Sequence, residues 1–283
     1  MYPTEFIQDI VARLVGVRGI KAIVLGGSWA TGTQEPDSDI DLGLYYNADM
    51  PLDIAHIRQI ARELNDDPTI YITGLGEWGR WVNGGAWLTI GGRRLDFLYK
   101  NLDFMASIVD DCYRGKIELD YYQQPPYGYY SYIYCAEIRE SVVLYDPEGA
   151  FQGLQAKVTS YPQPLKKAII DTFTWDAQFT LANAWKLAKR GDVYVVAGCL
   201  VRIASDLVQT VYALNEEFFL SHKRLKRDVA RFEMMPERFV ERIEQVLGQV
   251  GWGSDALCEA LPGIEGVLSD ITVLCGELYT PRF

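Results

Sequence analysis

Two aspartates separated by one residue form the first candidate site. Asp39 and Asp41 alternate with the apolar residues Ile40 and Leu42. Because successive side chains of a β-strand point to opposite faces, we expect both carboxylates on one face and their apolar neighbours in a core. Two anions held side by side repel each other unless a cation lies between them, and a hard divalent cation with oxygen ligands is the expected partner. The pattern therefore predicts that Asp39 and Asp41 bind Mg²⁺.

A glycine-rich turn precedes the aspartates. Residues 20–25 are mostly apolar and predict a short buried strand, after which Gly26 and Gly27 allow the backbone to turn tightly and to approach a ligand closely. Ser28 is expected to open a short helix, whose free N–H groups and hydroxyl can bind phosphate oxygens. We therefore expect Gly27 and Ser28 to hold a triphosphate beside the metal.

Each motif alone has a simpler explanation. The glycines could form only a turn, and the two acids could belong to a solvated acidic edge. The two motifs occur together, however, and each lies in the strand or turn context that its function requires. This combination favours binding of a metal and a phosphate.

The combined pattern resembles the nucleotidyltransferase superfamily of DNA polymerase beta. Members of that family have a Gly-Ser turn followed by an Asp-x-Asp strand, and Gly27, Ser28, Asp39 and Asp41 match this pattern. The resemblance implies a third carboxylate on a later strand, which acts as the base for the acceptor or completes the metal site. The sequence should therefore contain one more acid downstream.

Asp96 is the candidate for this third carboxylate. Residues 86–99 contain two apolar segments around Gly91-Gly92, and paired glycines at such a point predict a two-residue β-hairpin. Asp96 lies within the second strand, where a buried acid needs a partner. Its partner could instead be Arg93 or Arg94 in a structural ion pair. Asp103 is a weaker substitute because it is expected at the start of the following helix.

The resemblance also implies a reaction. Two Mg²⁺ ions would bridge Asp39, Asp41 and a nucleoside triphosphate, with Asp96 close enough to complete the metal site. Asp96 would deprotonate an acceptor hydroxyl, which would attack the α-phosphorus so that pyrophosphate leaves. The physical basis would be charge neutralisation and in-line positioning of the attacking and leaving oxygens.

The composition limits the acceptor. The chain of 283 residues has a formal net charge of −11, whereas a protein that binds long nucleic acids needs a basic surface. The organisation resembles small bacterial nucleotidyltransferases, including the adenylyltransferases that modify antibiotics. We therefore expect transfer of AMP from ATP, or of another nucleotide, to a small hydroxyl-bearing molecule. A protein or RNA-end nucleotidylating enzyme and a non-catalytic nucleotide sensor stay open as alternatives.

The cellular context is expected to be the cytoplasm. The five cysteines show no C-x-x-C spacing, which is typical of reduced thiols. The N-terminal residues lack the basic start and apolar core of a secretory signal. We expect no apolar run of membrane-spanning length, because the run at residues 193–201 is far too short.

The chain is expected to contain two domains. Residues 1–150 mix short strands, glycine turns and helices, whereas residues 151–283 are almost wholly helical in pattern. This organisation predicts an α+β fold, in which a nucleotidyltransferase-type mixed sheet with helices is followed by a C-terminal helical bundle. The helices of the second domain are predicted at residues 165–189, 193–219, 236–249 and 255–278.

One basic run stands out in the acidic chain. Residues 221–227 carry most of its charges, and Arg231 continues the run. Lys223 could bind the β- and γ-phosphates, because an ammonium group stabilises the charge of departing pyrophosphate. Such a run could equally form a solvated helix face.

Two aromatic segments complete the candidates. Residues 121–134 are rich in tyrosine, and they could line an acceptor pocket, stack a base or pack between the domains. Trp78, Trp81 and Trp87 surround a glycine-rich segment that could form a lid. Trp87 lies on a predicted strand, and we expect it in the core.

Overall fold

The computed structural model describes residues 4–282 and separates them into two compact units. The first unit contains the described residues up to Asp110 together with Leu119–Ser160, and the second contains Asp111–Glu118 together with the residues from Tyr161 onward. We predicted a division at residue 150. Helix α7 (Ala150–Lys157) lies in the first unit, where the ring of Phe151 lies 4.7 Å from the ring of Tyr45.

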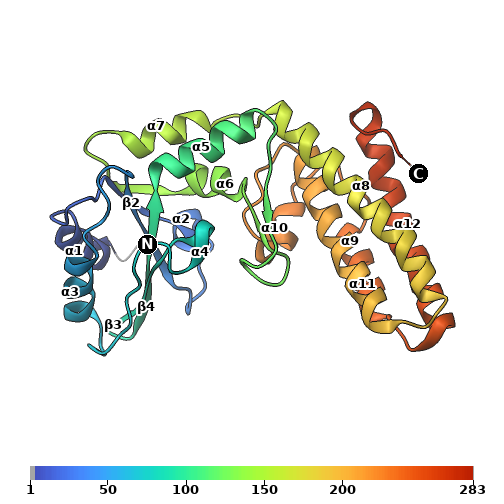
Figure 1. Cartoon of the computed structure of the whole chain (residues 1–283), viewed down its shortest axis with the longest axis horizontal. Helices are drawn as coiled ribbons and strands as arrows, with labels where there is room; N and C mark the ends of the chain where they lie inside the picture. Colours follow the sequence, from blue (N-terminus) through green and yellow to red (C-terminus); the bar gives the residue numbers. More distant parts are fainter. Residues whose placement is uncertain (1–3, 283) are drawn as a thin grey trace. The chain divides into compact units, whose positions relative to one another are not determined.

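The first unit is built on a mixed five-stranded sheet with the strand order β3-β4-β2-β1-β7 (Figure 1). The strands are β1 (Ala22–Leu25), β2 (Ile40–Tyr46), β3 (Gly85–Ile90), β4 (Arg93–Asn101) and β7 (Val142–Tyr145). Strands β2 and β4 are parallel, and the other neighbouring pairs are antiparallel. The predicted hairpin is present, because β3 and β4 pair across Gly91-Gly92.

Helices surround this sheet. They are α1 (Thr4–Leu14), α2 (Gly27–Thr31), α3 (Ile54–Leu64), α4 (Gly79–Val82), α5 (Leu102–Tyr113), α6 (Ile133–Glu140) and α7, and the short strands β5 (Leu119–Asp120) and β6 (Tyr129–Tyr130) form a separate ribbon. Helices α1 and α3 lie side by side (Figure 1).

The core of the first unit lies on one face of the sheet. Ile10 from α1 and Ile57 from α3 pack there against Leu42 and Phe97, and all four side chains are buried. Successive side chains of a strand point to opposite faces of the sheet, so the residues between these apolar positions face the other side. Alternation thus presents polar side chains of β2 and β4 on the face opposite the core.

The second unit is helical. It contains α8 (Gln163–Ala188), α9 (Val193–Leu214), η1 (His222–Arg224), α10 (Leu225–Val229), α11 (Phe239–Gly248), α12 (Gly253–Cys275) and η2 (Gly276–Leu278). The long helices pack along one another (Figure 1). The predicted α+β fold with a C-terminal helical region is therefore confirmed, and each of the four predicted helices has a counterpart.

Helix α9 corrects the sequence-based expectation that no apolar segment is long enough to cross a membrane. Its 22 residues are sufficient by length and composition, although 56% of its most apolar window is buried inside the protein. The core helix of a soluble protein passes the same test, so the finding is weak evidence for a membrane span.

Candidate active site

Asp41 and Asp96 lie next to each other on neighbouring strands. The register of the parallel pair β2 and β4 places Asp41 opposite Asp96. Their sequence neighbours point into the core, as shown by the burial of Leu42 and Leu95. The predicted alternation therefore brings the second acid of the Asp-x-Asp motif together with the later carboxylate, on the face of the sheet that lacks the apolar core.

The proximity of these carboxylates changes the acidity of Asp96. The pKa of Asp96 is raised from 3.8 to about 7, first by burial and then by repulsion from Asp41 and Asp39, whereas the positive charge of Arg94 lowers it. A carboxyl group with this pKa exchanges protons near neutral pH, which is the requirement for a general base. Asp96 thus has both the position and the acidity for proton transfer.

Asp39 forms an ion pair with Arg94. It lies immediately before β2, and its Oδ1 atom is 2.6 Å from the Nε atom of Arg94, which also donates a hydrogen bond to the carbonyl of Asp37. Arg93 instead lies over the ring of Phe6, at 5.3 Å from its centre. Within the described residues neither arginine forms an ion pair with Asp96, although the charge of Arg94 lowers the pKa of Asp96.

Gly27 lies directly against the side chain of Asp41. Its φ angle is +61°, and a Cβ atom at this position would lie 1.9 Å from Asp41 Oδ2. The adjacent Gly26 donates a backbone hydrogen bond to the carbonyl of Asp41 at 2.9 Å. The glycine turn is therefore required both for its left-handed backbone conformation and for the placement of the Asp41 carboxylate.

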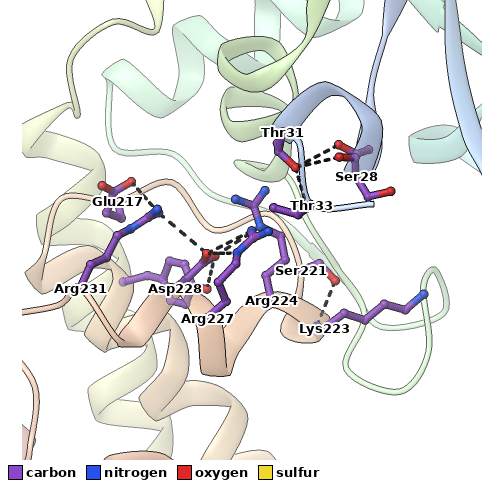
Figure 2. A network of polar contacts seen from close by, with 12 residues as sticks. Ser28, Thr31, Thr33, Glu217, Ser221, Lys223, Arg224, Arg227, Asp228 and Arg231 are labelled. Atoms are coloured by element: carbon purple, nitrogen blue, oxygen red, sulfur yellow. Dashed lines mark hydrogen bonds and ion pairs between the residues drawn. The ribbon is translucent and has the colours of Figure 1, made fainter. Parts of the chain in front are cut away.

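Ser28 lies in the first turn of α2, as predicted. The first N–H groups of a helix have no acceptor within that helix, and the N-terminal residue of α2 lies next to Asp41. The hydroxyl of Thr31 donates to the carbonyl groups of Ser28 and Gly27, and it shares a hydrogen bond with Thr33 (Figure 2). These hydrogen bonds stabilise the short helix α2, which follows the glycine turn.

The donor set fits a divalent cation in its chemistry. Asp41 and Asp96 offer carboxylate oxygens at adjacent positions, and oxygen ligands of this kind suit Mg²⁺. Across residues 4–282, no group of three or more histidine, cysteine, aspartate or glutamate side chains is close enough to hold an ion. Arg94 forms an ion pair with Asp39 in this arrangement. Binding of a cation by all three acids therefore requires this ion pair to open.

Asp103 has a structural role. Its Oδ1 atom accepts a hydrogen bond from Asn47 at 3.0 Å, and its Oδ2 atom accepts one from the backbone of Ala48 at 2.7 Å. These bonds connect the start of α5 to the loop after β2. They favour Asp96 over Asp103 as the third carboxylate of the site.

Lys223 belongs to the second unit. It lies in η1, and its backbone N–H donates to the hydroxyl of Ser221 at 3.2 Å. Its predicted contact with phosphate stays a prediction.

Neighbouring arginines of this basic run surround a buried acid. The side chains of Arg224, Arg227 and Arg231 form ion pairs with Asp228, which is 2% exposed and also accepts a hydrogen bond from Tyr212 (Figure 2). This part of the run therefore stabilises the helical unit.

The tyrosine-rich segment packs within the first unit. The ring of Tyr129 stacks on Trp81 at 5.3 Å, and the hydroxyl of Tyr134 donates to the carbonyl of Trp81 at 2.5 Å. Trp81 is only 1% exposed. Tyr121 and Tyr122 are exposed instead, so the segment divides into a surface part and a core part.

Trp87 differs from its predicted place in the core. It is 67% exposed, and it stacks on Trp78 with ring centres 4.7 Å apart. The core position was wrong because the neighbouring Ala86 and Leu88 fill the buried face of β3. Alternation along the strand then directs Trp87 to the same face as the acids, a signal that the sequence contained.

The first part of the chain is similar to a known protein family. Residues 6–121 match a family model described as a nucleotidyltransferase domain, and residues 133–225 match a domain of unknown function, DUF4037. No curated protein matches the chain. A solved nucleotidyltransferase-like protein from Exiguobacterium sibiricum shares 10% sequence identity at a TM-score of 0.46, with 97% of this chain and 76% of that chain covered.

Proposed function

We propose that this chain transfers AMP from ATP to a hydroxyl group of a small molecule, with Mg²⁺ as the metal. The proposal starts from the nucleotidyltransferase domain that the chain carries, through which it belongs to the nucleotidyltransferase superfamily of enzymes. The observation that supports this reaction best is the pairing of Asp41 with Asp96 beside Gly27. It brings together two carboxylates, one of them with a pKa raised to about 7, and the turn that we propose to bind phosphate.

Each residue has a defined role in the proposed reaction. Asp39, Asp41 and Asp96 would hold Mg²⁺, which neutralises phosphate charge when bound. Asp96 takes the proton of the acceptor hydroxyl, whose oxygen forms a new bond to the α-phosphorus. The bond from the α-phosphorus to the bridging oxygen breaks, and pyrophosphate leaves with that electron pair.

The turn after β1 positions the triphosphate. Ser28 offers its hydroxyl and the first N–H groups of α2, while Gly27 keeps the backbone close to Asp41 without a side chain between them. The ligand therefore meets donors on one side and the carboxylates with their metal on the other. Loss of the Ser28 hydroxyl should weaken triphosphate binding and leave the carboxylates in place.

Lys223 is the proposed cation for the β- and γ-phosphates. Its neighbours Arg224 and Arg227 pair with Asp228, and Lys226 pairs with Glu244 at 2.7 Å. Lys223 itself makes no ion pair within the described part of the chain. In the test, Lys223→Gln should raise the Kd for triphosphate, and Lys226→Gln should not.

The acceptor is proposed to be small because of the charge of the protein. A formal net charge of −11 repels the phosphate backbone of long nucleic acids, and it tolerates a neutral or cationic acceptor. The carboxylates of the site likewise repel the phosphates of a long nucleic acid and tolerate a neutral or cationic acceptor. A metal-neutralised triphosphate and a neutral hydroxyl compound can therefore meet there without strong repulsion.

Label transfer tests the proposed function. The purified protein is incubated with Mg²⁺, α-labelled nucleotides and a panel of hydroxylated small molecules, and the labelled products are separated. Transfer by the intact protein and by Asp37→Asn, with loss in Asp41→Asn, would support the enzyme, because Asp37 is an exposed acid on the same segment. Triphosphate binding without transfer to any acceptor would favour a nucleotide sensor.

A further inference from the structure

Trp87 continues the row of side chains formed by the two acids. On one side of β4, Asp41 lies opposite Asp96, and on the other side, Trp87 of β3 lies opposite the same Asp96. Neighbouring strands are about 4.8 Å apart, so side chains at paired positions on one face are direct neighbours. The indole of Trp87 therefore borders the proposed base.

A second indole makes this position a flat surface. Trp78 stacks on Trp87 with an angle of 22° between the ring planes. Isolated exposed apolar residues are common on proteins and need no explanation, but two stacked tryptophans at the edge of a candidate site form a larger apolar surface. Because Trp87 is 67% exposed, most of its surface is available to a ligand.

The chain holds Trp78 in place over the sheet. Its backbone N–H donates to the carbonyl of Asn83 at 3.0 Å, which closes the loop around α4. A Cβ atom at Gly85 would lie 3.0 Å from Trp78 Cζ3 and 1.8 Å from the carbonyl oxygen of Phe97. The absence of a side chain at Gly85 thus lets Trp78 approach β3 and stack on Trp87.

The strand order separates this surface from the triphosphate position. Strand β1 leads into Gly27 and Ser28, and the order β1-β2-β4-β3 then places Asp41, Asp96 and Trp87 progressively farther from that turn. A triphosphate at the turn and at Asp41 would have Asp96 between it and the two indoles. The molecule whose hydroxyl reaches Asp96 from the other side must lie on Trp87.

We propose that Trp78 and Trp87 form the binding surface for the acceptor and that the acceptor is a ring-bearing hydroxyl compound, a nucleoside or a sugar. This inference rests on the proposed function, because it assigns the acceptor side of the same site. Flat π faces and the apolar faces of rings stack on indoles, which supply contact area without fixing a hydrogen-bond pattern. The hydroxyl of the stacked ring then points toward Asp96.

Binding of defined probes tests this assignment directly. Adenosine, methyl α-glucoside and glycerol serve as the base-bearing, sugar and ring-free probes, and their Kd values are measured by ligand-observed NMR in the presence of Mg²⁺ and a non-hydrolysable triphosphate. Adenosine or the glucoside should bind more tightly than glycerol. Trp87→Ala should raise the Kd of that ring probe at least tenfold, and Trp87→Phe should restore most of the affinity.

Trp252→Ala is the matched control, because Trp252 is 89% exposed but lies in the second unit. It should leave every Kd unchanged. Mn²⁺ binding, followed by electron paramagnetic resonance, should be the same in Trp87→Ala and in the intact protein. Equal binding of ring probes to the intact protein and to Trp87→Ala, or binding no tighter than that of glycerol, would overturn the assignment.

The two proposals can fail separately. If label transfer requires Asp41 but Trp87→Ala leaves the KM for the acceptor unchanged, the nucleotidyl transfer stands and the indole surface is wrong. If ring probes bind through Trp87 but no label is transferred to any of them, the indole surface stands and the proposed transfer to this ligand is wrong.

Discussion

Asp41 and Asp96 occupy paired positions on the adjacent parallel strands β2 and β4. This pairing joins a motif near the start of the chain to a carboxylate on a later hairpin. It places the acids where burial, and then their mutual repulsion, raise the pKa of Asp96, and it leaves the apolar residues beside them in the core. The register of β2 and β4 thus determines both the packing of the apolar core and the chemistry of the opposite face of the sheet.

A comparison of Gly27→Ala with Gly32→Ala should distinguish the effect of backbone strain from the effect of displacing the Asp41 carboxylate. The new methyl group would collide with Asp41 Oδ2, so Mn²⁺ affinity should fall at least tenfold. Gly32→Ala is the control, because Gly32 also has a positive φ angle but has no atom within 4 Å of the added Cβ. Both variants should lose roughly 1–2 kcal/mol of stability in urea unfolding. Unchanged Mn²⁺ affinity in Gly27→Ala would contradict the predicted displacement.

Arg94→Gln should increase the affinity of the nucleotide-free protein for Mn²⁺. Arg94 pairs with Asp39 at 2.6 Å, so an incoming cation must compete with the guanidinium group. Removing this competitor should lower the Kd several-fold in a titration at low salt. Arg93→Gln is the control, since Arg93 contacts Phe6 and not Asp39. Weaker Mn²⁺ binding to Arg94→Gln would show that Arg94 supports the metal site.

Asp206 should make the stability of the helical unit depend on pH. Burial and the nearby Asp176 raise the pKa of Asp206 from 3.8 to about 9, while Arg202 pairs with Asp176 at 2.6 Å. Between these two pH values the folded chain keeps a proton that the unfolded chain has lost. The free energy of unfolding should therefore fall as pH rises from about 4 to about 9.

Asp206→Asn should remove this pH dependence, because the amide has no proton to lose. At pH 8 the variant should be more stable than the intact protein by roughly 1–3 kcal/mol in urea unfolding. Asp192→Asn, at an exposed position before α9, serves as the control and should keep the original slope. A slope that persists in Asp206→Asn would assign the pH dependence to another group.

Asp228→Ala should destabilise the second unit strongly. The change leaves three arginine side chains around a buried position without their carboxylate, and loss of one member of a buried ion pair costs about 3–5 kcal/mol. Chemical unfolding followed by circular dichroism measures this loss. Glu244→Ala breaks only an exposed ion pair with Lys226 and should leave the unfolding midpoint nearly unchanged. Similar midpoints for the two variants would argue against a structural role for Asp228.

Local patterns were enough to predict much of the first unit. Alternation around Asp41 predicted which residues face the core, and the paired glycines at 91 and 92 predicted the hairpin. The pairing of Asp41 with Asp96 could not be derived from either segment, because it depends on the register between strands that are distant in sequence. Only the resemblance to a family supplied that expectation.

Other features depended on contacts that no local pattern contains. Arg94 was considered as a partner of Asp96, but the geometry of the sheet brings it to Asp39. Trp87 was expected in the core because it lies on a predicted strand, although alternation with Leu88 would have placed it on the face of the acids. The basic run was considered as a phosphate site or a solvated face, whereas several of its arginines surround Asp228.

The position of bound metal tests the central claim most directly. Crystals grown with Mn²⁺ and a non-hydrolysable triphosphate should show anomalous density between Asp41 and Asp96, with Asp39 released from Arg94 and the phosphates at Gly27 and Ser28. The same experiment on Asp41→Asn should lose this density. Mn²⁺ bound away from the paired carboxylates, or a triphosphate bound elsewhere with the Asp39–Arg94 ion pair intact, would contradict the proposed active site.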